Sequence, residues 1–425
     1  MPLLRSASGS QRVFVVAAAA FLLVAPFPSS AGWRVSFLVA AGIALWLLAR
    51  HREQPLDLQL VPRAFALTAI AWIALCAASL AWSVDAAYTL EELRRELLYG
   101  AAAFLVFFVG TRSIAQLHLW IATLFLGVLM LGLGEWLHMV FPRVWLFRKA
   151  SMGPGPLSTH VLLLAPLVVL LAWKPPLGMG ARPAVVVLTA IFLVAAGLAG
   201  ESRMLWPALL VAAAAGFAVV SLDAASVGAG RTIARRIFLV ALALFPLLMM
   251  ASAEYKLRYY PGAASPAESL ELDERRVIWR VAGDKATARP WAGHGYGREI
   301  VGAEIEKGLA AGGVAKPFLH GHNVFLDVAI QLGALGLAAF AALVAALAAS
   351  YWRARREALP LALCGLALLA GYLAKNLTDD FFHRPNSLVF WAMNGMLLAI
   401  ASRPSAWGSP RGAASPATGT PAPSA

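Results

Sequence analysis

The sequence predicts an all-α polytopic membrane protein with about twelve transmembrane helices. Two observations indicate this class. Of the 425 residues, 60% are hydrophobic and only 13% are charged, whereas a soluble protein carries about a quarter charged residues. The apolar residues also form long blocks, and a helix needs about 20 such residues to cross a bilayer. Only helices and closed barrels satisfy their backbone in lipid, and the alternating segments of about ten residues that are typical of barrels are absent.

Twelve apolar segments are the predicted spans: 12–28, 34–49, 64–82, 97–111, 114–134, 157–173, 183–200, 204–222, 236–253, 323–350, 359–375 and 387–402. The first resembles a signal peptide, but no small-x-small cleavage site follows it and a second span comes at once. We therefore expect it to be retained. The two cysteines, Cys76 and Cys364, both lie inside predicted spans, which argues against a disulfide or a zinc site.

Basic residues in the short connections predict the orientation. An even number of spans places both termini on one side, and that side holds 16 of the 35 basic residues against four acidic ones. Because lysine and arginine in short loops favour the cytoplasm, both termini are predicted to be cytoplasmic. The formal charge of +13 is then a signal of topology, and no nucleic-acid partner is needed to explain it.

Four regions follow from this assignment. Residues 1–253 hold nine spans, 254–322 form one large outer loop, 323–402 hold three further spans, and 403–425 form a cytoplasmic tail. The tail is rich in Pro, Ala, Ser and Gly, so it is predicted to be disordered. No internal repeat is evident, and the cue for a secondary transporter is therefore missing.

The large outer loop contains an expected amphipathic helix over 265–287, with Ser265 as its cap and Pro266 in its first turn. The glycine-rich stretch RPWAGHGYG then ends the helix. A helix that leads into such a turn beside a membrane is a candidate site wall. Four of its residues are candidates to lie against the membrane surface: Val277, Ile278, Trp279 and Val281.

Arginines on the outer face have two readings each. Arg203, in a short connection between spans, either snorkels to headgroups and pairs with Glu201 or binds an anionic substrate. Arg275 and Arg276 either lie on a solvated helix face or bind the same anion.

The last outer loop, KNLTDDFFHRPN, concentrates charged residues. Solvation and local ion pairs are the simplest explanation of its five ionisable side chains: Lys375, Asp379, Asp380, His383 and Arg384.

Two histidines precede the tenth span. His320 and His322 lie on one face of an extended segment, so chelation of a metal is geometrically feasible. A metal needs a third ligand, however, and neither a nearby cysteine nor an HExxH spacing supplies one. A surface pair, a hydrogen-bonded boundary residue and a catalytic base all stay open on this pattern alone.

Four motifs occur in order along residues 200–340: Ser202-Arg203, Arg-x-x-x-Trp over 275–279, Pro-x-x-Gly-x-Gly over 290–295, and His322-Asn323 followed by Gly333-x-x-Gly336. As an ordered set they resemble the O-antigen ligase and O-antigen polymerase family, membrane glycosyltransferases of the GT-C type. The resemblance is stronger for this superfamily than for ligase over polymerase.

For an O-antigen ligase, the resemblance implies transfer of a glycan from undecaprenyl diphosphate to lipid A–core oligosaccharide, with inversion at the anomeric carbon. The reaction takes place at the periplasmic face of the bacterial inner membrane and involves lipids but no nucleotide, cofactor or metal. In this interpretation His322 is the general base, and Arg203 and Arg275 hold the diphosphate. Further candidates for substrate binding are Arg276, Asn323, His320 and Asp379.

Three alternatives stay open. An O-antigen polymerase and a protein O-oligosaccharyltransferase use the same donor with other acceptors. A transporter or flippase for lipid-linked glycans belongs to a different class and predicts charged or broken segments at mid-membrane. Asp327, about one turn into the tenth span, is the acid that suits this last reading best.

Overall fold

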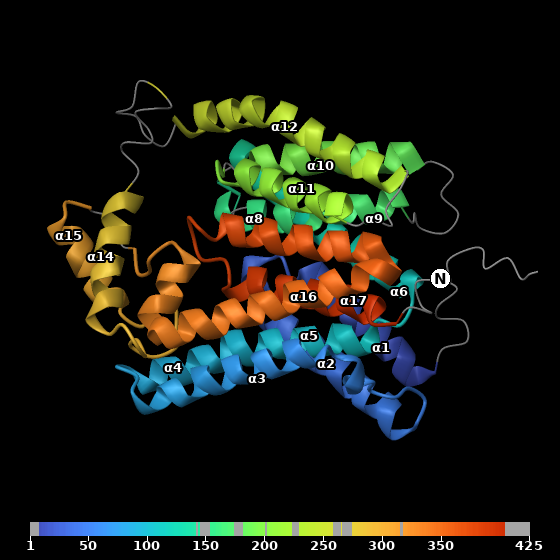
Figure 1. Cartoon of the computed structure of the whole chain (residues 1–425), viewed down its shortest axis with the longest axis horizontal. Coiled ribbons are helices and arrows are strands. Elements are labelled where there is room, and N and C mark those ends of the chain that lie inside the picture. Colours follow the sequence, from blue (N-terminus) through green and yellow to red (C-terminus); the bar gives the residue numbers. More distant parts are fainter. Residues whose placement is uncertain are drawn as a thin grey trace, which may run out of the picture.

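The computed structural model describes residues 8–141, 143–144, 154–173, 182–199, 202–222, 229–257, 265, 274–314 and 318–403. Within these residues the chain is helical and has no strand. Long helices lie side by side, and α14 and α15 pack at one end of the bundle, whereas the connection between α2 and α3 lies at the other (Figure 1). The elements are α1 Gly9–Val24, α2 Ala31–Arg50, α3 Arg63–Ala78, α4 Ala86–Glu92, a π-helical turn η5 Leu93–Leu98, α5 Tyr99–Gly110, α6 Ile114–Val140, α8 Pro154–Leu164, α9 Leu167–Trp173, α10 Arg182–Ala199, α11 Leu205–Leu222, α12 Ala229–Lys256, α14 Arg275–Ala288, α15 Gly302–Ala311, α16 Val324–Lys375 and α17 Arg384–Ala401.

Six helical segments of the described chain are long and apolar enough to cross a membrane: Pro28–Arg50, Arg63–Ala81, Ile114–His138, Leu205–Leu222, Ala234–Glu254 and Val324–Lys375. Three shorter apolar helices accompany them: Gly9–Val24, Gly155–Leu164 and Val187–Leu198. The all-helical, multi-pass class is therefore confirmed, whereas the count of twelve spans stays a prediction.

Three predicted spans can be compared in detail with the helices observed. The predicted spans 323–350 and 359–375 both lie in the segment α16, in which two helices meet at a kink at Ala358 (φ −140°, ψ 57°) just before Pro360. Proline removes a backbone donor and ends the regular hydrogen-bond ladder. The predicted span 157–173 is divided between α8 and α9.

Small residues let the spanning helices approach closely. A Cβ added at Gly395 of α17 would lie 2.4 Å from the Phe104 carbonyl oxygen of α5, and one at Gly127 of α6 would lie 2.5 Å from the Leu23 carbonyl oxygen. Packing through small residues is the usual way to associate helices in lipid. Around these contacts a continuous apolar core includes fully buried Trp120, Tyr372 and Phe107.

The helices α14 and α15 share a small core of their own. Ile278 and Ala282 of α14 are buried against Ile305 and Leu309 of α15, with Ile330 of α16 completing the cluster. Val277 and Val281 also pack against this cluster, so these side chains and Ile278 face protein, and the expected contact with the membrane surface is wrong for them. The helix expected over 265–287 is observed from Arg275 onwards, and its earlier part, 266–273, lies outside the described residues.

The loop that follows α14 is hydrogen-bonded to α16 at a break in that helix. Gly333 has φ 62° and ψ −154°, a conformation that is essentially restricted to glycine. The loop 290–297 supplies the backbone partners that the interrupted ladder loses: the His294 and Gly295 N–H groups donate to the Ile330 and Gln331 carbonyls, each at 2.9 Å. The Ala334 N–H in turn donates to the Pro290 carbonyl at 2.7 Å. Buried backbone groups must be paired, so the glycine-rich loop and the break require each other.

Substituting Gly333 by alanine is expected to destabilise the protein by about 3 kcal/mol, since the backbone conformation is strained for any residue with a Cβ. The new Cβ would also lie 2.4 Å from the Trp291 carbonyl carbon. The measurement is the apparent melting temperature in detergent. Gly32→Ala is the matched control, because a Cβ at Gly32 of α2 meets no atom within 4 Å; an equal loss in both variants would contradict the argument.

Candidate active site

Asn323 closes the sequence HGHN and starts α16. Its Oδ1 accepts hydrogen bonds from the Phe325 and Leu326 N–H groups at 3.0 and 3.2 Å, which is the geometry of an N-cap. Its Nδ2 donates to the Leu377 carbonyl at 2.9 Å. The observed contacts of Asn323 therefore join the start of α16 to the loop that follows its end, and the expected role in orienting substrate stays a prediction.

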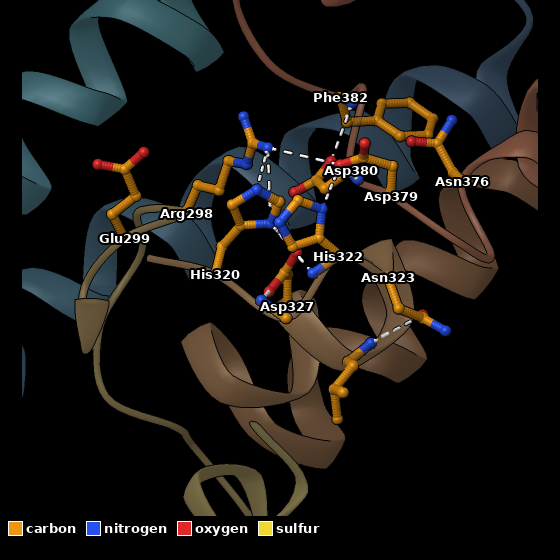
Figure 2. A network of polar contacts seen from close by, with 12 residues as sticks. Arg298, Glu299, His320, His322, Asn323, Asp327, Asn376, Asp379, Asp380 and Phe382 are labelled. Atoms are coloured by element: carbon orange, nitrogen blue, oxygen red, sulfur yellow. Dashed lines mark hydrogen bonds and ion pairs between the residues drawn. The ribbon is translucent and has the colours of Figure 1, made fainter. Parts of the chain in front are cut away.

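His322 pairs with Asp379, which lies 57 residues further along the chain. The His322 Nδ1 atom is 3.1 Å from Asp379 Oδ1, and Figure 2 shows the two side chains facing each other. Since a carboxylate only accepts, Nδ1 carries the proton and Nε2 has a free lone pair. The imidazole keeps 17% of its surface exposed. An oriented histidine with an available ring nitrogen has the arrangement of a general base.

Asp379 is kept ionised by its neighbours. Burial alone would raise the pKa of its carboxyl, but the hydrogen bond from His322 and the charge of Arg298 outweigh burial and hold the pKa below its ordinary range. An ionised carboxylate fixes the ring orientation of His322 and stabilises the imidazolium that forms when the ring takes a proton.

His320 has a different role from His322, although their ring centroids are only 3.9 Å apart. The guanidinium of Arg298 contacts His320 Nε2, and arginine only donates, so this nitrogen is the acceptor. His320 Nδ1 lies 3.3 Å from Asp327 Oδ2 and 3.1 Å from the His322 backbone nitrogen. Burial, followed by the charge of Arg298, lowers the pKa of His320 well below its ordinary value. Both ring nitrogens are engaged, so His320 supports the loop and is poorly placed to accept a proton from substrate.

Arg298 is the functional candidate that sequence reasoning missed. In addition to His320 it faces Asp379, with Nη2 3.7 Å from Oδ1, and Figure 2 shows it at one side of the polar network, with dashed lines to both residues. The available signal was its position three residues after the Pro-x-x-Gly-x-Gly motif. Because Arg298 lies in a turn, helical periodicity gave no reason to select it.

The structure distinguishes the two neighbouring arginines of α14. Arg275 Nε donates to the Thr378 carbonyl at 3.0 Å, beside Asp379, whereas Arg276 is exposed. Adjacent helical residues point about 100° apart, so only one of them faces the site.

Arg203 follows Ser202, whose side chain contacts the end of α16. It is buried, and the hydroxyl of its neighbour Ser202 accepts a hydrogen bond from Lys375 Nζ at 3.0 Å. Lys375 is fully buried at the end of α16 and also donates to Ser158 Oγ at 2.7 Å. The Ser-Arg motif is thereby joined to the end of α16, just before the loop that carries Asp379.

Metal binding is also a geometric option at this site. One ligand atom from each of His320, His322 and Asp379 lies within 4.8 Å of the others, so Asp379 is the third ligand that the sequence did not reveal. The donor set fits a cation poorly, however. Arg298 already contacts the outer nitrogen of His320, and its positive charge lies where a metal would bind. Acid–base chemistry suits these residues better.

Residues 161–341 match a family model described as O-antigen ligase. The resemblance to the O-antigen ligase and polymerase family is confirmed. Members of this family are membrane glycosyltransferase-like enzymes, and lipid-linked glycans and membrane lipids are their partners. Arg203, Arg275, Arg298 and His322 lie inside the matched segment, whereas Asp379 lies beyond it. A comparison with curated proteins found no match.

A cavity of about 380 Å³ lies next to this polar network. Its walls come from α3, α5, α16 and α17 and are mostly apolar, with Ile70, Leu105 and Phe340 among them. At one end it reaches a polar group of five residues: Glu92, Glu96, Arg298, Asp380 and His383. The cavity thus joins the candidate active site to the apolar flank of the bundle.

The acids at this polar end carry less charge than their number suggests. Burial raises the pKa of Glu96 to about 7, and burial, followed by the charge of Asp327, raises the pKa of Asp380. His383 Nδ1 lies 3.3 Å from Glu96 Oε1. Partial protonation of the acids would ease the approach of an anionic group to Arg298.

His320→Gln is expected to lower the apparent melting temperature more at pH 7.5 than at pH 5.5. The folded-state pKa of His320 is depressed, so the unfolded chain binds a proton that the folded chain does not. The contribution of this residue to stability is therefore full above about pH 6.5 and falls as the pH drops below it. Thermal melts of both proteins at three pH values measure the difference, and a difference that stays constant with pH would contradict the assignment.

Proposed function

We propose that this protein is an O-antigen ligase that transfers polysaccharide from undecaprenyl diphosphate to lipid A–core oligosaccharide. The pairing of His322 with Asp379, next to Arg298 at the head of an apolar cavity, is the observation that carries the proposal. A candidate base (His322), a cation (Arg298) and an apolar cavity thus lie close to one another.

The donor is an amphiphile, and the site has a surface for each of its parts. The apolar walls of the cavity suit the polyprenyl chain, because burying such a chain contributes about 0.8 kcal/mol per CH₂. Its diphosphate then lies near Arg298. Arg275 and Arg203 flank the same loop, and guanidinium groups bind phosphate oxygens through paired hydrogen bonds while staying charged.

The transfer is a single displacement at the anomeric carbon. His322 Nε2 accepts the proton of an acceptor hydroxyl as its oxygen bonds to that carbon from the side opposite the leaving group. The bond to the diphosphate oxygen breaks, its electron pair leaves with undecaprenyl diphosphate, and the configuration inverts. Fixed arginine charges stabilise the developing negative charge, and Asp379 stabilises the imidazolium until it releases its proton to water.

The orientation belongs to the same proposal: an inner membrane protein with cytoplasmic termini and a periplasmic site. The site lies at the start of α16 beside α14 and α15, at one end of the bundle (Figure 1). The short connections predicted to be cytoplasmic carry Arg50, Arg52 and the Arg353, Arg355 and Arg356 group, in agreement with the bias of inner loops.

The transporter alternative loses its main support in this geometry. Asp327 accepts a hydrogen bond from the Gly321 N–H at 2.6 Å and lies 3.3 Å from His320. Its contacts hold a loop at the start of α16, so it is not a mid-membrane acid poised to bind an ion or substrate.

His322→Ala is expected to lower the transfer rate by about 10²–10⁴-fold, the usual contribution of general base catalysis. The assay combines purified protein, lipid-linked donor and acceptor in detergent, with EDTA and without nucleotide. His51→Ala, an exposed histidine after α2, is the control with expected full activity. A wild-type rate in His322→Ala would remove this residue from the mechanism.

Arg298→Ala is expected to raise the KM for the lipid-linked donor at least tenfold, because a charge-assisted phosphate contact is lost. Arg280→Ala removes an exposed arginine from α14 and is expected to leave the donor KM unchanged. Equal effects of the two substitutions would indicate a general surface-charge effect and would contradict specific binding by Arg298.

Complementation distinguishes ligase from polymerase. The gene is expected to restore long-chain lipopolysaccharide in a ligase-deficient strain and to leave a polymerase-deficient strain without a ladder, as read on a lipopolysaccharide gel. A ladder restored only in the polymerase-deficient strain would refute the ligase assignment and support the polymerase.

A further inference from the structure

Trp279 is a large exposed aromatic side chain directly beside the candidate base. It keeps 37% of its surface exposed, and its Nε1 lies 3.4 Å from the His322 carbonyl oxygen, to which it donates. This contact fixes the indole next to the histidine through its polar edge. The polar requirement of the ring is met by protein, and the exposed remainder is apolar.

The surface of α14 around Trp279 is open on one side. Gly283 follows Trp279 by one turn on the same helix face, and a Cβ added there would meet no atom within 4 Å. Arg275 precedes Trp279 by one turn on that face and binds the loop of Asp379. The strip therefore presents a cation, then a flat aromatic ring, then bare backbone.

Phe318 lies on another side of the histidine. Its ring meets the His322 ring edge to face, with centroids 5.0 Å apart and an interplanar angle of 88°. Phe318 thus contacts the ring of His322, whereas Trp279 contacts its backbone carbonyl. The cavity that reaches Arg298 is lined by other residues and does not include Trp279.

A sugar ring matches this strip chemically. One face of a pyranose consists of C–H groups, which carry a slight positive charge and pack on the negative face of an indole ring, while its hydroxyls project from the edge. The diphosphate has arginines to bind, and the polyprenyl chain has the apolar cavity. The acceptor sugar is the remaining part of the substrates, and its hydroxyl must reach His322.

We propose that Trp279 is the stacking platform of an acceptor-glycan site. The terminal sugar of the acceptor lies on the indole above Gly283, with one hydroxyl directed at His322 Nε2. This inference rests on the proposed function and adds the position of the acceptor to it.

The test compares Trp279→Ala and Trp279→Phe with the wild-type full-length protein in detergent. Trp279→Ala is expected to raise the KM for the acceptor about tenfold and to leave the KM for the donor unchanged. Trp279→Phe keeps an aromatic face and is expected to restore most of the loss. Trp291→Ala is the control, since Trp291 is 74% exposed on the loop 290–297, and removal of its side chain is expected to change neither KM.

Direct binding gives a readout that does not depend on turnover. Lipid-free core oligosaccharide is titrated into each protein by calorimetry, and Trp279→Ala is expected to bind about tenfold more weakly than wild type and than Trp291→Ala. If the wild-type protein binds this oligosaccharide through Trp279 but transfers no glycan, the proposed function fails and the glycan site stands.

Three results would overturn the inference. An unchanged acceptor KM in a folded Trp279→Ala protein would exclude stacking. An equal rise in the acceptor KM in Trp279→Phe and Trp279→Ala, at wild-type melting temperature, would also exclude stacking, because an aromatic face would then not contribute to acceptor binding. Equal loss in Trp279→Ala and Trp291→Ala would assign both residues to anchoring at the membrane interface.

Discussion

The junction between the loop 290–297 and the break in α16 is the constraint on which the site depends. A helix interrupted in the bundle leaves backbone amides and carbonyls that must find partners, and the loop supplies them at Ile330, Gln331 and Ala334. The same loop also bonds to the turn after α3, where the Val84 N–H donates to the His294 carbonyl at 2.9 Å and Trp82 Nε1 to the Ala292 carbonyl at 2.8 Å. Residues distant in sequence are thereby held in one rigid unit, and Arg298, which follows the loop directly, takes its position from it.

A chain of buried polar contacts extends from that unit. Arg298 reaches both His320 and Asp379, His320 reaches Asp327, and Asp379 reaches His322. Each of these five side chains has at least one polar partner in the network, as a site of low dielectric requires. The network also separates the two histidines chemically. One has both ring nitrogens engaged, whereas the other keeps a nitrogen available for substrate.

The location at the end of the bundle explains why such a network fits a membrane protein. The long apolar helices provide apolar walls, and the connections at their ends provide arginines, carboxylates and histidines. A substrate with a lipid chain and an anionic head has the same division of polarity. Trp279 and Gly283 extend this division outward, to a surface that is neither lipid-like nor strongly anionic and that suits sugar.

The sequence by itself determined what depends on neighbouring residues. Long apolar blocks settled the all-helical membrane class. Unpaired backbone N–H and C=O groups are costly in lipid, so few structures other than helices can cross a membrane. The motifs of 200–340 were sufficient for the family resemblance, and His322 and Asn323 were located at the start of a helix.

Tertiary structure decided what depends on segments that are far apart in sequence. The pairing of His322 with Asp379, the central position of Arg298 and the inward orientation of Arg275 rather than Arg276 all arise where separate loops meet. No periodicity within one segment encodes such contacts.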